Sequence, residues 1–287
     1  MALNINARSF NCELSPRALD LWNPDLRAAL EAGTDTITMY GIIGEDWYGE
    51  GVTLKRVDAA LRAIGDKPVT VYINSPGGDM FEGIAIYNRL LEHSQEITIK
   101  VLGLAASAAS VIAMAGTKRE VAKTAFLMIH NCWTYLAGNR HAIRDLADTM
   151  EEFDRAMISL YADTSGQDEK TVEKMLDAET YMNGSNAVEK GFATGLISAA
   201  EVEEAPSEEH AQALSARKLD AALAKSGMTR SERRKLISEI KTGTPGAVSG
   251  DKPRAVVPGM PSAALDVSAF EETANQASAL RSFLPSC

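Results

Sequence analysis

Three short stretches of the sequence combine residue types that could carry out acyl transfer. In the first, Ser107 lies in the small-residue run 103–110, where an expected strand end runs into an expected helix. A serine there can act as a nucleophile, and the amide of Ala108 can stabilise the negative charge on the attacked carbonyl oxygen. The alternative is that Ser107 is only a small packing residue. Ser110, one helical turn later, is a competing hydroxyl without the strand-end position.

The second stretch, Ile73-Asn74-Ser75-Pro76-Gly77-Gly78-Asp79, follows a β-branched strand and precedes a helix. Two adjacent glycines allow the main chain to expose its amide groups, and amides at a helix start can stabilise an oxyanion. This pattern indicates Gly78 as an oxyanion donor. A tight strand-to-helix turn is the alternative interpretation.

The third stretch places His130 at the end of the apolar segment 126–130. Histidine is the side chain best suited to accept a proton from a serine hydroxyl near neutral pH. The other histidines lie at a helix end (His93), at the start of a polar helix (His141) and in a polar tail (His210). His130 is therefore the candidate base, although a lone histidine is more often structural than catalytic.

The elements that must position these residues alternate along the chain. Short β-rich runs alternate with longer helical runs from Thr34 to about Ile197, which indicates crossover connections and a largely parallel sheet. The expected strands are 36–42, 69–73, 96–101 and 126–130, and the expected helices are 53–64, 80–92, 103–115, 140–164 and 169–176. The pattern predicts an α/β fold.

The composition changes near residue 200, where Ala, Glu and Ser become abundant and Pro-Gly segments interrupt any regular pattern. We therefore expect an N-terminal segment (1–33), a catalytic domain (34–199) and an Ala/Glu/Pro-rich tail (200–287). The tail is expected to be flexible, with one short helix at 229–240 that Thr229 or Ser231 caps.

The overall composition excludes several classes of protein. The 287 residues carry a net charge of −10, which argues against a protein that grips nucleic acid. Three widely spaced cysteines, Cys12, Cys132 and Cys287, indicate neither a disulfide framework nor a metal site. No leader or membrane-spanning stretch is expected, so the cytoplasm is the expected location.

Taken together, these stretches resemble Clp protease proteolytic subunits, and most of all the ClpP-related head-maturation (prohead) proteases of phages. The matching segments are 73–78, 83–87, 103–107, 128–130 and 187–195, in the family's order. The resemblance implies a ClpP/crotonase-like fold of repeated β-β-α units. It also implies Ser107 as nucleophile, His130 as base, and the amides of Gly78 and Ala108 as oxyanion donors.

The same resemblance places the third member of the triad within residues 177–182. The family's aspartate aligns with Glu179, and a glutamate can still orient an imidazole. Asp177 is the reserve candidate. Either acid could instead only cap or solvate the loop before the helix that starts near Asn183.

The implied function is an ATP-independent serine endopeptidase that matures a phage head by processing scaffold or capsid proteins, without cofactor or metal. The implied location is the host cytoplasm or the inside of a phage procapsid. A ring-like homo-oligomer is expected, in which helix 140–164 contributes to ring-ring contacts. The alternatives are general protein turnover with a Clp-type ATPase and a non-catalytic scaffold or assembly protein. An acyl-CoA enzyme of the crotonase type shares the architecture but usually lacks a Ser-His pair.

Overall fold

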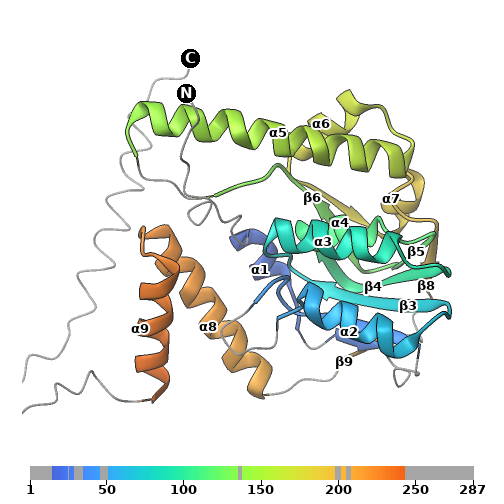
Figure 1. Cartoon of the computed structure of the whole chain (residues 1–287), viewed down its shortest axis with the longest axis horizontal. Coiled ribbons are helices and arrows are strands. Elements are labelled where there is room, and N and C mark those ends of the chain that lie inside the picture. Colours follow the sequence, from blue (N-terminus) through green and yellow to red (C-terminus); the bar gives the residue numbers. More distant parts are fainter. Residues whose placement is uncertain are drawn as a thin grey trace, which may run out of the picture. The chain divides into compact units, whose positions relative to one another are not determined.

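A mainly parallel β-sheet organises the protein (Figure 1). The computed structural model describes residues 15–24, 26–28, 35–45, 51–134, 138–197, 202–204 and 208–242. The strands are β1 (Leu26–Ala28), β2 (Thr36–Tyr40), β3 (Val69–Ser75), β4 (Ile97–Ala106), β5 (Lys118–Ala122), β6 (Phe126–Ile129), β7 (Thr180–Asn183), β8 (Gly195–Ile197) and β9 (Val202–Glu204). The main sheet has the order β2-β3-β4-β5-β8, and β6 pairs with β4 and β7. Its pairs are parallel except β6 with β7, which confirms the predicted fold class.

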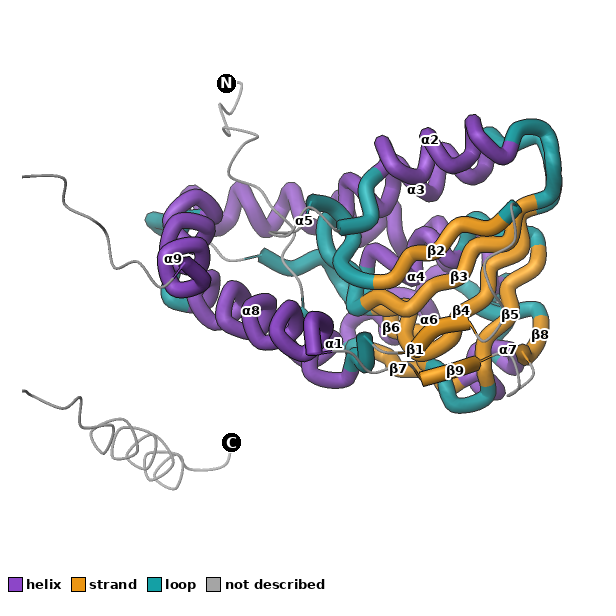
Figure 2. Tube along the Cα trace, turned by 90° about the horizontal axis from the view of Figure 1, so that it is seen from below, coloured by secondary structure: helices purple, strands orange, loops and turns teal. Residues whose placement is uncertain are grey.

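Helices lie between many of the strands along the chain, and the last two helices follow the last strand described. They are α1 (Pro16–Leu21), α2 (Leu54–Ile64), α3 (Met80–Leu91), α4 (Ala108–Ala113), α5 (Arg140–Ser165), α6 (Glu169–Asp177), α7 (Gly184–Glu189), α8 (Glu208–Lys225) and α9 (Arg230–Thr242). Helices α2, α3 and α4 lie on one face of the sheet, and the antiparallel β1–β9 ribbon lies on the other (Figure 2). None of the described helices is long and apolar enough to cross a membrane.

Strand β4 is the longest strand described, and its two halves pair with different strands. Its first half pairs with β5, whereas residues 104–106 pair with β6. The expectation that a helix begins at Gly103 is therefore wrong, because the chain stays extended to Ala106 and α4 starts only at Ala108. Small residues fit there because both faces of the strand are buried, a setting in which strand and helix patterns look alike.

The two faces of β4 pack into different clusters, as the alternation of side chains in a strand requires. Ala105 belongs to the large core beneath α2–α4. Leu104 and Ala106 face the other way, where they meet Leu19 and Trp22 of the N-terminal segment. That segment thus covers the back of the strand end that precedes Ser107.

The predicted tail contains more regular structure than the sequence indicated. The helix expected at 229–240 is present as α9, but α8 was not predicted, because its many alanines leave no clear apolar stripe. Helix α8 contacts the N-terminal segment through Arg217, which lies over the Trp22 ring, and through a Lys218–Asp20 ion pair. Residues 243–287 of the predicted tail lie outside the described residues.

Candidate active site

Ser107 lies between the end of β4 and the first turn of α4. Its backbone has φ 54° and ψ −126°, a conformation that is uncommon outside glycine. The Ser107 N–H donates to the carbonyl of Met128 on β6 at 3.0 Å. The strand end and this hydrogen bond hold the serine hydroxyl toward the end of β6.

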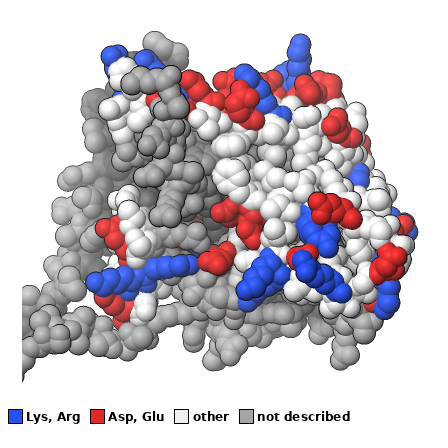
Figure 3. Space-filling model, in the orientation of Figure 1, with Lys and Arg blue, Asp and Glu red and all other residues white. Residues whose placement is uncertain are grey.

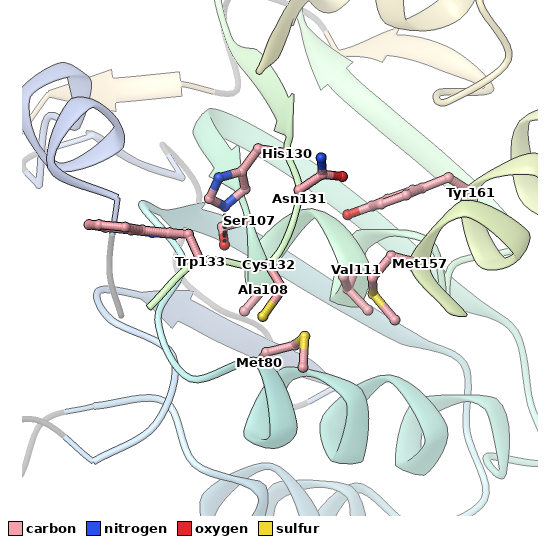
Figure 4. A pocket seen from close by; sticks show the side chains of 10 residues that line it. All are labelled: Met80, Ser107, Ala108, Val111, His130, Asn131, Cys132, Trp133, Met157 and Tyr161. Carbon is pink, nitrogen blue, oxygen red and sulfur yellow. Dashed lines mark hydrogen bonds between the residues drawn. The ribbon is translucent and has the colours of Figure 1, made fainter. Parts of the chain in front are cut away.

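His130 follows β6 directly, and the parallel register Ala106↔Met128 brings it beside Ser107. Nε2 of His130 lies 2.8 Å from Oγ of Ser107, as Figure 4 illustrates. Only 5% of the histidine side chain is exposed. Burial lowers the pKa of His130 below its ordinary value of 6.5, and the negative charge of Glu179 partly opposes that effect. The ring is therefore neutral at pH 7 and able to accept a proton.

Glu179 lies opposite His130 because β7 runs antiparallel to β6 with Ile129 facing Thr180. Oε1 of Glu179 is 3.8 Å from Nδ1 of His130, which is an ion-pair distance and longer than a hydrogen bond. The glutamate side chain is 43% exposed, and its backbone has φ 46°. The carboxylate can thus act on the imidazole chiefly through its charge.

Asp177, the reserve candidate, has a different partner. It ends α6, and its Oδ1 accepts a hydrogen bond from the side-chain amide of Asn131 at 2.7 Å. Within the described residues, the acid that pairs with His130 is Glu179. The sequence did not decide between the two acids, and in the structure they have different partners: Glu179 faces the imidazole of His130, and Asp177 accepts from the side-chain amide of Asn131.

The chain after His130 is held by a second carboxylate. The Cys132 N–H donates to Oδ1 of Asp154 on α5 at 2.7 Å. Burial, with smaller contributions from the nearby charges of Asp177 and Glu151, raises the pKa of Asp154, and the Cys132 amide opposes this shift. These contacts fix the course of residues 131–132 beside the serine. No sequence pattern pointed to Asp154.

Of the two expected oxyanion donors, Ala108 directly follows Ser107 in the chain, and Gly78 directly follows Gly77, which packs on the serine. Ile43 forms hydrogen bonds with the residues on either side of Gly78: its carbonyl accepts from the N–H of Asp79, and its N–H donates to the carbonyl of Gly77. In such a parallel bridge the N–H of the middle residue, Gly78, points away from Ile43. A Cβ on Gly77 would lie 2.7 Å from Cβ of Ser107, so the glycine turn packs directly on the serine. The N–H of Ala108, first in α4, has no acceptor within its helix.

Comparison with known proteins decides the family. The Clp protease family model matches residues 57–200, a span that contains Ser107, His130 and Glu179. The chain belongs to the Clp protease family. The match confirms the family-level resemblance and counts against the crotonase alternative.

Two relatives known by sequence agree with this membership of the Clp protease family. The ATP-dependent Clp protease proteolytic subunit of Ligilactobacillus salivarius is 34% identical over 134 residues, covering 46% of this chain and 68% of the relative. Subunit 1 of the same enzyme from Prochlorococcus marinus is 32% identical over 129 residues, covering 44% of this chain and 66% of the relative. A solved structure of a ClpP1 mutant from Listeria monocytogenes is 24% identical, with a TM-score of 0.49, and covers 57% of this chain and 91% of that one.

A small, mostly apolar cavity of about 30 Å³ adjoins Ser107 in this Clp protease chain. Figure 4 shows the side chains that surround it. They are Met80 of α3, Ala108 and Val111 of α4, Met157 and Tyr161 of α5, and Ser107, His130, Asn131, Cys132 and Trp133. No sequence pattern pointed to the lining residues of α3 and α5, because they approach the serine only through the packing of helices distant in the chain. Among the described residues, no group of three or more His, Cys, Asp or Glu could hold a metal ion.

Proposed function

We propose that this member of the Clp protease family is a serine endopeptidase in which Ser107 is the nucleophile and His130 the base. The observation that carries the proposal is the 2.8 Å contact between Ser107 Oγ and Nε2 of the buried His130. A serine is a weak nucleophile until an adjacent base can take its proton, and a neutral imidazole at hydrogen-bond distance meets that need.

In the proposed mechanism, Ser107 Oγ attacks the carbonyl carbon of a peptide bond while His130 Nε2 takes the hydroxyl proton. The N–H groups of Gly78 and Ala108 stabilise the resulting oxyanion. Glu179 offsets the positive charge of the imidazolium, with Asp177 as the reserve candidate for that role. His130 then protonates the departing amine, and water hydrolyses the acyl-enzyme with His130 again as base.

The surroundings of Ser107 favour an uncharged substrate segment. The side chains that α3 and α5 contribute to the cavity are Met80, Met157 and Tyr161. In the space-filling view, charged side chains gather over α5 and over α2, and a mostly uncharged strip lies between them (Figure 3). A peptide with an apolar residue before the scissile bond is therefore the substrate to test first.

The direct test is labelling by a fluorophosphonate, followed by mass spectrometry of the labelled peptide. We expect one adduct, on Ser107, in the wild type, and loss of both labelling and peptide hydrolysis in Ser107→Ala. Ser226→Ala, which removes an exposed serine hydroxyl, is the control and retains both. Peptidase activity that persists in Ser107→Ala refutes the proposal.

For the biological role, we propose the ATP-independent maturation of a phage head, with scaffold or capsid proteins as substrates. The support is the Ala/Glu/Pro-rich sequence of residues 200–287, which except for residue 200 lies beyond the region matched by the family model and suits an assembly or substrate segment. Its test is cleavage, without ATP, of the capsid or scaffold protein encoded beside this gene. A tail that stays uncut and is dispensable for assembly removes the assembly role.

The relatives' names favour one alternative role, because they describe proteolytic subunits of an ATP-dependent protease. Under that alternative, folded proteins are degraded only when a Clp-type ATPase and ATP are supplied. A non-catalytic assembly role predicts that Ser107→Ala supports head formation as well as the wild type does. The three roles thus give different outcomes in three assays: cleavage of capsid or scaffold protein without ATP, degradation of folded protein with an ATPase, and head formation with Ser107→Ala.

We also propose a ring-like homo-oligomer in which the first half of α5 mediates contacts between rings. The core residues of α5, Met157, Tyr161 and Ala162, all lie in its second half. Its first half carries an incompletely buried stripe, Ile143, Leu146 and Met150, at helical spacing. Light scattering should show smaller particles for Ile143→Lys, whereas Asp148→Lys, on another side of the helix, keeps the assembly intact.

A further inference from the structure

Ser110, which the sequence offered as a competing nucleophile, is fully buried in α4. Its Oγ donates a hydrogen bond of 2.7 Å to the carbonyl oxygen of Ser107 and lies 2.8 Å from the hydroxyl oxygen of Tyr161 on α5. The hydroxyl is thus engaged on both sides and is turned toward the main chain of the proposed nucleophile.

The direction of these hydrogen bonds follows from the number of protons available. A serine hydroxyl has one proton, and that of Ser110 is given to the Ser107 carbonyl, so Tyr161 must be the donor to Ser110. Burial raises the pKa of the Tyr161 hydroxyl above its ordinary value of 10, which keeps the proton in place at any physiological pH. Tyr161, Ser110 and the Ser107 carbonyl therefore form one buried chain, whose members strengthen one another.

The far end of this chain reaches the peptide group of the Ala108 amide, where the N–H groups of Ser110 and Val111 also donate to the Ser107 carbonyl, at 2.9 and 3.3 Å. The Ser107 carbonyl and the Ala108 N–H belong to one planar trans peptide group, in which they point in opposite directions. Fixing the oxygen therefore fixes the direction of the N–H. This restraint matters because Ser107 has a positive φ, a conformation that persists only where the surroundings hold it.

We infer that Ser110 and Tyr161 are positioning residues that orient the Ala108 N–H toward the oxyanion of the acylation step. The inference rests on the proposed function, since it assigns a role in that reaction. It also explains why a hydroxyl occurs in a run of alanines where packing alone requires only a small side chain. Tyr161 borders the cavity beside Ser107, and Figure 4 shows its hydroxyl end directed toward α4, so the chain joins the cavity wall to the oxyanion donor.

The test compares Ser110→Ala, Tyr161→Phe and the double variant in the full-length protein, using a fluorogenic apolar peptide and a peptide aldehyde. The aldehyde forms a tetrahedral adduct with an active serine and so reports on the oxyanion site. Thr117→Val is the matched control, because it also removes a hydroxyl that donates to a main-chain carbonyl, that of Ile97, at the opposite end of β4.

We expect Ser110→Ala to lower kcat about 10-fold with KM unchanged, less than the roughly 10²–10³-fold cost of losing an oxyanion donor outright. Affinity for the aldehyde should fall by the same factor, and the acidic limb of the pH profile should stay in place, because His130 is untouched. Tyr161→Phe should give a smaller loss of the same kind. The double variant should be no worse than Ser110→Ala, because either change breaks the same chain. Thr117→Val should match the wild type.

Several results overturn the inference. Unchanged kcat in Ser110→Ala, a change confined to KM, or aldehyde affinity that does not follow kcat contradicts a role at the oxyanion. If Ser110→Ala does not fold, Tyr161→Phe decides, and wild-type kcat and aldehyde affinity in that variant refute the inference. A wild type that neither hydrolyses peptides nor reacts with a fluorophosphonate refutes the proposed function as well, which distinguishes the two failures.

Discussion

Replacing Glu179 with glutamine removes a negative charge 3.8 Å from Nδ1 of His130 while keeping the side chain's size. Opposite unit charges about 4 Å apart attract by about 1 kcal/mol in water and about 4 kcal/mol at an effective dielectric constant of about 20. Since Glu179 is 43% exposed, the pair belongs nearer the aqueous value. A loss of about 1.4 kcal/mol in transition-state stabilisation corresponds to about a 10-fold lower kcat/KM, far less than the ~10⁴-fold cost in enzymes with a buried, hydrogen-bonded aspartate.

The assay is hydrolysis of a fluorogenic peptide by Glu179→Gln across pH, with Asp177→Asn as the matched control. Burial places the pKa of His130 below 6.5, so the acidic limb of wild-type kcat/KM should lie below pH 6.5. The charge of Glu179 raises the pKa of His130, so its removal should move that limb to still lower pH. A larger activity loss in Asp177→Asn than in Glu179→Gln, or a limb that moves to higher pH, refutes this assignment.

Three further predictions concern the frame around the site. Gly77→Ala should lower kcat about 10²-fold in the peptide assay, because the new Cβ would lie 2.6 Å from the Ala106 carbonyl oxygen and displace Ser107. Gly65→Ala is the control and should keep full activity, because Gly65 also has a positive φ but a Cβ there would meet no atom within 4 Å. Arg119→Met should lower the free energy of unfolding by about 2–3 kcal/mol in urea titrations, since the guanidinium donates to four main-chain carbonyls; equal stability contradicts this. The pKa of His130 is lower in the folded protein than in the unfolded chain, so as the pH falls below 6.5 residue 130 gains its proton first in the unfolded chain, and the stability of the folded protein should decrease. Thermal unfolding should show a smaller decrease in His130→Gln.

The sequence located the serine, the histidine and the glycine turn because each occupies the end of a strand in an alternating α/β pattern. Parallel strands bring such ends to one edge of a sheet, so their neighbourhood could be predicted before any coordinates. The same local patterns wrongly predicted a helix at residues 103–106, since a buried strand of small residues has the same sequence pattern as a buried helix. They also missed α8, whose alanine-rich sequence has no periodic apolar face.

What the sequence determined by itself is therefore the α/β class and the short list of groups able to do acyl-transfer chemistry. Only the tertiary structure decided which acid meets the imidazole, because the choice between Glu179 and Asp177 depends on the register of β7 against β6. It also decided that Ser110 faces the main chain of Ser107 and that Tyr161 completes the chain of hydrogen bonds. Side chains 51 residues apart meet there through helix packing, and such contacts leave no local pattern in a single sequence.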